Sequence, residues 1–490
     1  MQPFNRIPLG EWLPDRPAYP NRGATLAKNC VPQADSYRAL LDFIKATDPV
    51  AGGGGVVGAT WAVTSAGTVR VVVGTPTRLL LLSGVSWATI GSGYPSVPSW
   101  EFALFGDSLI AVAPGVDPQL IDLSAITPTA AALTGAPDSP PRARRIAIVR
   151  DFVLMGDLDA APDTIQWSGY SNSTIWATYG NTAYQADSQK LFSGGAVQKI
   201  VGGPFGYIFQ ENEIRAVEYV GPPVIFSISV ISRDRGTPAA DSVISAGDKV
   251  FFYAQDGFHM LQGKQFTPIG EERVNRWFLE NVSPDEIANT KGSVDRANRV
   301  AVWAFATQTG GNYDRLLIYN YSVNRWSYAE TDLSFLVEMR TAGYDLDTLA
   351  TLLTSGIDLD SFPIESRQYL GGALTLVGVN AAGRLGTFDG SALTGVFETP
   401  EFDGGGNLRR FLSGVRPVVE GVPGTTITVQ VGHRNTLQEL VTWTSERSLN
   451  SIGEANILVD ARYMRVRLNV RGGFTHATAV DVLSRASGRF

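Results

Sequence analysis

The three histidines of this sequence are its best candidates for catalysis or metal binding, but their spacing argues against both. His259, His433 and His476 lie in separate stretches of the chain. No H-E-x-x-H, G-x-S-x-G or Walker A motif is present, so metalloprotease, hydrolase and P-loop chemistry have no match. A Ser-His-Asp site around one histidine stays open, although a strand or turn histidine with a local hydrogen bond fits better. We therefore assign no catalytic residue and no cofactor, and we expect no enzymatic activity.

Three aspartates in GDLDAAPDT form a second group of residues that could bind a ligand. Asp157, Asp159 and Asp163 are close enough in sequence to share a calcium ion through carboxylate oxygens. The remaining ligands of a calcium loop are missing, so we interpret the three side chains as turn caps and assign no metal ligand. A bound calcium ion is the alternative.

Arginines close to the C-terminus could form a basic strip on a β-sheet. A solvated face paired with acids such as Glu439 and Asp460 is the simplest interpretation, and direct DNA binding is another. An assembly interface is the functional interpretation, because sheet faces that carry Arg and Tyr suit specific docking. The candidate interface residues are Arg409, Arg410, Arg416, Tyr463, Arg465, Arg467 and Arg471.

Composition limits the class of protein. The chain has 490 residues, a net charge of −7 and 18% charged residues, so it lacks the basic excess by which proteins hold nucleic acid. Its single cysteine, Cys30, allows no internal disulfide and fits a reducing compartment. Apolar runs are short, and we expect neither a membrane span nor an export signal.

The elements that carry these residues are predicted to be short antiparallel strands. In the stretch Asp241 to Trp277, Lys249 to Ala254 reads as a strand, Asp256-Gly257 as a tight turn and Phe258 to Leu261 as the returning strand. A third short run, Phe266 to Ile269, follows a turn at Gly263. About 35 residues thus hold three or four strands, which is the size of one blade of a β-propeller.

Similar strand pairs recur along the chain, each with its own turn. The spacing of the turns is about 40 to 70 residues, which predicts a β-propeller of six or seven blades; a stack of sandwiches is the alternative. The turns lie near Ala66-Gly67, Gly106-Asp107, Arg150-Asp151, Glu211-Asn212, Asp256-Gly257, Gly310-Gly311 and Ala382-Gly383.

Three segments are predicted in this all-β chain. Residues 1–50 form an extended arm, because six prolines before residue 35 disfavour both helices and central strands. Residues 51–395 form the propeller, with a helical insertion near 341–368 where an aspartate twice precedes an apolar run. Residues 396–490 form a separate β-sandwich. Within it, Met464, Val466, Leu468 and Val470 alternate with polar residues and predict one buried face.

Several of these stretches resemble virion proteins of short-tailed bacteriophages. The similarity covers nearly the whole chain and is one of order and composition rather than of catalytic signatures. It includes LGEWLPDRPAYPNRGATLAKNCVP near the N-terminus, IQWSGYSNSTIW (Ile165 to Trp176), AYQADSQKL (Ala183 to Leu191), EIRAVEYVGPPVIFSI (Glu213 to Ile228), RDRGTPAADSVISAGDKVFFYAQDGF (Arg233 to Phe258), PIGEERVNRWF (Pro268 to Phe278), the two Asp-Leu-Asp motifs at Asp345 and Asp358, and ARYMRVRLNVRGGFTHATAVDV with the closing SGRF.

The resembled family is that of the tail hub or nozzle. The resemblance implies a structural protein of the virion tail, assembled in the host cytoplasm, that forms a ring of six copies below the portal and adaptor. Such a ring retains the packaged genome, conducts double-stranded DNA without binding it specifically, and contacts tail fibres or spikes and a needle or plug. A glycan-binding or glycan-cleaving propeller for host attachment is the alternative.

Overall fold

The computed structural model of the chain describes residues 5–50, 55–177, 184–341, 374–403 and 408–488, and nearly all its regular structure is β-strand. Within these ranges the helices are α1 (Asn275–Asn281) and two 3₁₀ helices, η1 (Ala240–Ser242) and η2 (Pro284–Asn289). The all-β class expected from the sequence is confirmed. In the same ranges, no helix has the length and apolar character needed to cross a membrane.

The stretch Asp241 to Trp277 contains one four-stranded antiparallel sheet. Its strands are β24 (Ile244–Ala246), β25 (Lys249–Ala254), β26 (Gly257–Gln262) and β27 (Gln265–Pro268), paired in chain order. Ala254 lies opposite Gly257, which has a φ of 120° that favours glycine, so the predicted Asp-Gly hairpin is confirmed. The sequence did not indicate α1, which follows this sheet, because α1 has no capping side chain and buries only Phe278.

The same four-strand unit occurs seven times in the described residues, six times as a separate sheet and once as the beginning of a larger one. The first three units are β6 (Gly58–Val63), β7 (Val69–Thr75), β8 (Arg78–Ser83) and β9 (Ser86–Ser92); β10 (Glu101–Phe105), β11 (Ser108–Val112), β12 (Gln119–Asp122) and β13 (Ala130–Ala132); and β15 (Ala143–Val149), β16 (Phe152–Leu158), β17 (Ala161–Trp167) and β19 (Asp187–Lys190). β14 (Ala136–Pro137), which lies between the second and third units in the chain, pairs in parallel with β18 (Ile175–Trp176), which lies between β17 and β19.

The remaining units close the series. They are β20 (Val197–Val201), β21 (Gly206–Gln210), β22 (Ile214–Gly221) and β23 (Ile225–Ser232); the β24–β27 sheet; β28 (Lys291–Asp295), β29 (Val300–Phe305), β30 (Tyr313–Asn320) and β31 (Arg325–Leu333); and β32 (Phe335–Arg340), β33 (Leu374–Val379), β34 (Leu385–Thr387) and β5 (Ile44–Lys45).

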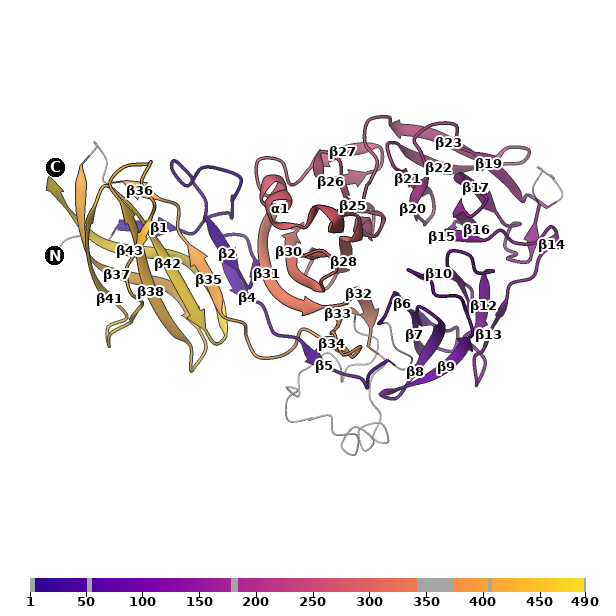
Figure 1. Cartoon of the computed structure of the whole chain (residues 1–490), viewed down its shortest axis with the longest axis horizontal. Helices are drawn as coiled ribbons and strands as arrows, with labels where there is room; N and C mark the ends of the chain where they lie inside the picture. Colours follow the sequence, from indigo (N-terminus) through magenta and orange to yellow (C-terminus); the bar gives the residue numbers. More distant parts are fainter. Residues whose placement is uncertain (1–4, 51–54, 178–183, 342–373, 404–407, 489–490) are drawn as a thin grey trace.

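These seven units follow one another around a common centre, as in a β-propeller (Figure 1). The last unit takes its outer strand, β5, from the beginning of the chain, where Ile44 lies opposite Thr387. Buried residues of β7 and β33, among them Val73 and Val379, share one hydrophobic cluster, so the first unit packs against the last. The ring is therefore closed.

All seven predicted turns lie between paired strands, but they do not occupy one position in the unit. The first three join the first and second strands, whereas the last four join the second and third. Turn chemistry marks a hairpin but not its place within a sheet, because the same residues suit either connection. The spacing of the turns alone therefore could not set the boundaries of the units.

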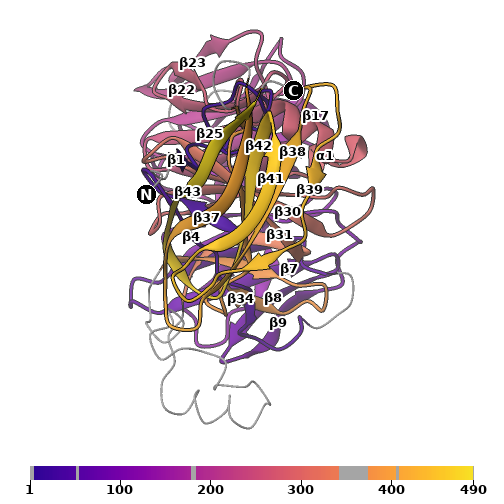
Figure 2. The ribbon, with the colours of Figure 1, turned by 90° about the vertical axis from the view of Figure 1, so that its left-hand side faces the viewer.

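Two sheets packed face to face form a sandwich beside the ring, and Figure 2 shows the molecule from this side. Their buried residues share one cluster. One sheet contains β1 (Asn5–Pro8), β3 (Cys30–Pro32), β4 (Tyr37–Ala39), β43 (Phe474–Gly488), β37 (Arg409–Gly421) and β41 (Ala455–Ala461). The other contains β35 (Gly395–Glu398), β42 (Tyr463–Arg471), β38 (Thr426–Arg434), β39 (Thr442–Trp443), β36 (Phe402–Asp403) and β40 (Arg447–Ser448). The four alternating apolar residues of β42 are fully buried, as predicted.

The N-terminal segment lies against the rest of its own chain. β1 pairs with β43, and Trp12 is fully buried. The expectation that the proline-rich residues contain no central strand is wrong, because β2 (Leu26–Lys28) lies between β31 and β35. These three residues stand in the gap between Pro20 and Pro32, where every amide is free to donate a hydrogen bond.

β2 makes the ring and the sandwich continuous. An eleven-stranded sheet runs from β28 to β31, crosses β2 and continues through β35, β42 and β38. Trp12 packs against Trp277 and Tyr328 with ring centroids 5.0 and 5.3 Å apart. Trp303 of the ring and Val466 of the sandwich belong to one hydrophobic cluster. The helical insertion predicted near 341–368 lies outside the described residues, apart from its first position.

Candidate functional site

The seven candidate interface residues are divided between the two sheets of the sandwich. Arg409, Arg410 and Arg416 belong to β37, whereas Tyr463, Arg465, Arg467 and Arg471 belong to β42. The alternating β42 residues point away from the other sheet, because the residues between them fill the core. The idea of a single basic strip is therefore wrong.

Arg465 and Arg467 are held on the outer face of β42 by a carboxylate and an indole. Glu398, which is 5% exposed, lies 3.5 Å from Arg465 and 2.6 Å from Arg467. The guanidinium carbons lie 5.1 and 3.9 Å from the ring centroid of Trp443, within the range of cation–π attraction. The predicted partner Glu439 instead accepts a hydrogen bond from the backbone amide of Asn435 at 2.8 Å.

The β37 arginines have their own partners. Arg409 lies 3.5 Å from Asp460, as the sequence suggested, and Arg410 donates to the hydroxyl of Ser484 at 3.1 Å. Arg416 lies opposite Asp481 in the ladder. The pKa of Asp481 is held below its ordinary value by a hydrogen bond from Arg6, with the charge of Arg416 adding to the effect.

The histidines remain in separate places. His259 is buried, and its Nε2 lies 2.8 Å from Asp256. Its pKa is lowered, because the cost of burying the charge outweighs the attraction of that carboxylate. His476 Nδ1 lies 2.9 Å from the hydroxyl of Ser36, and His433 lies on β38. No histidine of the described residues completes a Ser-His-Asp arrangement through the hydrogen bonds seen here.

The three aspartates of the calcium alternative have separate partners. Asp157 lies 3.8 Å from Arg144, Asp159 accepts from the amide of Gly115 at 2.9 Å, and Asp163 lies 3.3 Å from Lys190. Among the described residues, no group of three or more His, Cys, Asp or Glu is arranged to hold a metal ion.

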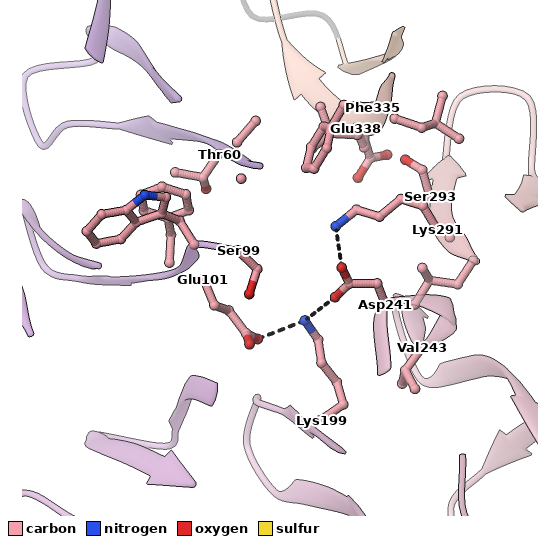
Figure 3. Close-up of a pocket in the computed structure, with 18 of the residues that line it drawn as sticks. Thr60, Ser99, Glu101, Lys199, Asp241, Val243, Lys291, Ser293, Phe335 and Glu338 are labelled. Carbon is pink, nitrogen blue, oxygen red and sulfur yellow. Dashed lines mark hydrogen bonds and ion pairs between the residues drawn. The ribbon is translucent and has the colours of Figure 1, made fainter. Parts of the chain in front are cut away.

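The centre of the ring contains a charged cavity that the sequence analysis did not identify. Its volume is about 290 Å³, and every one of the seven units contributes to its wall. Figure 3 shows the cavity with lining residues from six of the units labelled. The charged side chains that line it are Glu101 on β10, Arg145 on β15, Lys199 on β20, Asp241 on η1, Lys291 on β28 and Glu338 on β32.

Ion pairs connect five of these units across the cavity. Lys199 Nζ lies 2.8 Å from Glu101 and 4.0 Å from Asp241, and Lys291 Nζ lies 3.0 Å from Asp241 (Figure 3). Arg145 Nη1 lies between the two acids, 3.5 Å from Glu101 and 3.8 Å from Asp241. Burial opposes the charge of Asp241, but Lys291, Lys199 and Arg145 outweigh burial and hold the pKa of Asp241 well below its ordinary value.

Glu338 is paired separately, with Arg296. Burial is the largest influence on Glu338 and raises its pKa, while the charge of Arg296 acts in the opposite direction.

The charged residues of the cavity do follow a pattern in the sequence. Charged residues recur at positions 101, 145, 199, 241, 291 and 338, about once per unit, and five of the six stand on the first strand of their unit.

Comparisons with known proteins give a limited result. No family model and no curated protein matches the chain. Among solved structures, the extracellular domain of BT4673 from B. thetaiotaomicron, described as a one component system, matches with a TM-score of 0.42 and 11% identity, covering 82% of this chain and 47% of that chain. This chain thus spans about half the length of that neighbour.

Two structures of BBS1N in complex with ARL6DN, soaked with mercury and with lead, match with TM-scores of 0.41 and 0.39 and 10% identity each. Both cover 71% of this chain and 96% of the matched chain. Likenesses at these values identify neither a family nor a function.

Proposed function

We propose that this chain is a structural subunit of a phage tail, a hub or nozzle protein in which a seven-bladed β-propeller and a platform-like sandwich act as one rigid body. The resemblance to tail hub proteins supplies the functional class. In this proposal six copies form a ring below the portal and adaptor, retain the packaged genome and conduct it during ejection. No chemical step is involved, and the subunit resides in the virion tail after assembly in the bacterial cytoplasm.

One observation carries the proposal: the propeller-like ring and the sandwich share a hydrogen-bonded sheet through β2 and a common hydrophobic cluster. Backbone pairing and close packing leave little freedom for a hinge between the two parts. A subunit of a ring that transmits load needs such a fixed geometry, whereas a tethered binding module does not.

The sandwich offers surfaces suited to contacts with neighbouring subunits, adaptor or fibres. Within the described residues β41 pairs only with β37, so its other edge is available for strand addition. Leu458 on β41 is 72% exposed while its neighbours Ile457 and Val459 are buried. An exposed leucine at a strand edge and the Arg–Trp stack on β42 resemble the apolar and arginine-rich composition of protein interfaces.

The charge of the chain is compatible with a passive channel. Six copies carry a formal charge of −42 (6 × −7). Each lysine or arginine that contacts a phosphate increases the affinity for DNA, so an acidic assembly favours sliding of the duplex over tight binding. We expect the isolated chain to bind duplex DNA weakly even at low salt. A tight affinity that falls steeply with salt would contradict passive conduction.

The first test is gold-labelled antibody against this chain on intact particles from the same source. We expect label at the single tail vertex. Label on spikes would favour the glycan-directed alternative, and absence of label from every particle would overturn the proposal.

The second test addresses assembly. Leu458→Asp places a charge on the exposed β41 face without disturbing the core, and we expect native mass spectrometry to show loss of the six-copy ring. Ile126→Asp is the matched control, because Ile126 is 95% exposed on the propeller-like ring. Equal assembly of both variants would remove β41 from the interface.

A further inference from the structure

The wall of the central cavity contains as many cations as carboxylates, but they are not evenly paired. Arg145, Lys199 and Lys291 face Glu101, Asp241 and Glu338, which gives the wall a net charge of 0 (3 − 3). Glu338 is paired with Arg296, a residue outside the wall. The three cations of the wall therefore share the two remaining carboxylates, Glu101 and Asp241.

The cavity also has more hydrogen-bond donors than acceptors to receive them. Arg145 can donate five N–H bonds, yet its two contacts with carboxylates are 3.5 and 3.8 Å long and its Nε is buried without a partner. The two lysines approach one or two carboxylates each, although each ammonium has three donors. The hydroxyl of Ser293 is also buried without a partner. Unpaired buried donors of this kind are costly and rare.

The size and lining of the cavity restrict what could supply the missing acceptors. A volume of about 290 Å³ lies just below the range of about 300–1,000 Å³ found for small-molecule sites, so only a small ligand fits. Thr60, Ser99 and Ser245 add hydroxyl groups to the wall, and the ammonium of Lys291 lies 4.4 Å from the ring centroid of Phe335. In Figure 3 the side chains of Lys199, Lys291 and Asp241 extend into the space between the units.

We propose that this cavity is a binding site for a small oxyanion, a carboxylate or phosphate group, held by Lys199, Lys291 and Arg145. Guanidinium and ammonium groups bind such oxygens through short, charge-assisted hydrogen bonds. The ligand would give acceptors to the underused donors of the three cations that share Glu101 and Asp241. This site does not depend on the proposed role in a virion tail, because the residues argued to hold the ligand all belong to one chain.

The test uses the full chain titrated with inorganic phosphate or succinate, against sodium chloride at equal ionic strength. We expect phosphate, succinate or both to raise the melting temperature above the chloride control, and ³¹P line broadening to report phosphate directly. A response to phosphate alone assigns a phosphate ligand, and a response to succinate alone assigns a carboxylate. No response to either anion overturns the proposal.

Substitutions in and outside the cavity test whether the anion binds there. Thr60→Asp adds a carboxylate to the wall of the cavity, which would repel a bound anion, without removing an ion pair, and Thr60→Asn is its neutral, isosteric control. We expect Thr60→Asp to weaken binding about tenfold, as loss of one charged contact would, and Thr60→Asn to bind like the wild type. Lys199→Met should also weaken binding. Lys264→Met, at an exposed pair with Glu218, should not. Equal weakening by Lys264→Met, or no weakening by Thr60→Asp, would overturn the assignment to this cavity.

Discussion

Replacing Asp241 by asparagine tests how strongly the central ion pairs hold the ring together. The substitution keeps the shape of the side chain and removes its charge. Asp241 lies 3.0, 3.8 and 4.0 Å from Lys291, Arg145 and Lys199. At an effective dielectric constant of about 20, each such pair contributes about 4–6 kcal/mol, and the three together about 14 kcal/mol as an upper limit.

The net loss of folding stability in Asp241→Asn is much smaller than this limit. The cost of removing the carboxylate from water offsets most of the attraction, and the side chain is still 32% exposed, so solvent screens part of the rest. Removing one partner of a fully buried pair costs about 3–5 kcal/mol, and we therefore expect about 3 kcal/mol for Asp241→Asn. For a chain of 490 residues, that corresponds to a fall in melting temperature of about 3 °C.

Differential scanning calorimetry at several pH values is the suitable assay. The pKa of Asp241 is lowered in the folded state, so its contribution is complete above the ordinary aspartate value of about 4 and is lost as the pH falls below it. The two proteins should therefore differ most near pH 7 and converge in acid. Asp117→Asn, which breaks an exposed pair with Arg142, should melt close to the wild type. The reasoning fails if Asp241→Asn melts within about 1 °C of the wild type at pH 7, or if the difference persists unchanged at pH 3.

Four further perturbations have defined outcomes. Ala27→Pro removes an amide from the strand between β31 and β35, so we expect the single calorimetric transition of ring and sandwich to split in two; one unchanged transition would contradict this. Trp303→Ala empties a fully buried site and should cost about 3–5 kcal/mol in chemical denaturation, whereas a loss below about 1 kcal/mol would not fit close packing. His259→Gln should reduce the loss of stability between about pH 7 and pH 5, because burial lowers the pKa of His259 and only the unfolded chain takes up its proton there. EDTA should leave the melting temperature unchanged, since Asp157, Asp159 and Asp163 each have another partner; a marked fall would revive the calcium alternative.

Local features of the fold could be predicted from the sequence. The Asp256-Gly257 hairpin followed from turn chemistry, and the buried face of β42 followed from strict alternation. Both depend on residues within a few positions of one another, where backbone preference and burial act directly. The position of each hairpin within its unit did not follow, because it depends on which sheet the strand joins.

Features that depend on distant pairing could not be predicted. β2 becomes central only because β31 and β35, about 300 and 370 residues away, lie on its two sides. The cavity charges come from six units, and each charged residue alone looks like an ordinary surface residue. Likewise, the C-terminal arginines were predicted as one strip because sequence does not tell which of two packed sheets a strand belongs to.

The pairing of the N-terminal strands has a consequence for the order in which the chain can fold. β5 finds its partner only after Thr387 has been synthesised, and β1 only after the residues of β43. The first segment to leave the ribosome must therefore wait for nearly the whole chain before Ile7, which lies opposite Val480, is covered. Closing such long loops is entropically costly and slow. Truncation close to the C-terminus would thus leave both ends of the chain unpaired, and a nascent chain stalled there would be a natural target for chaperones.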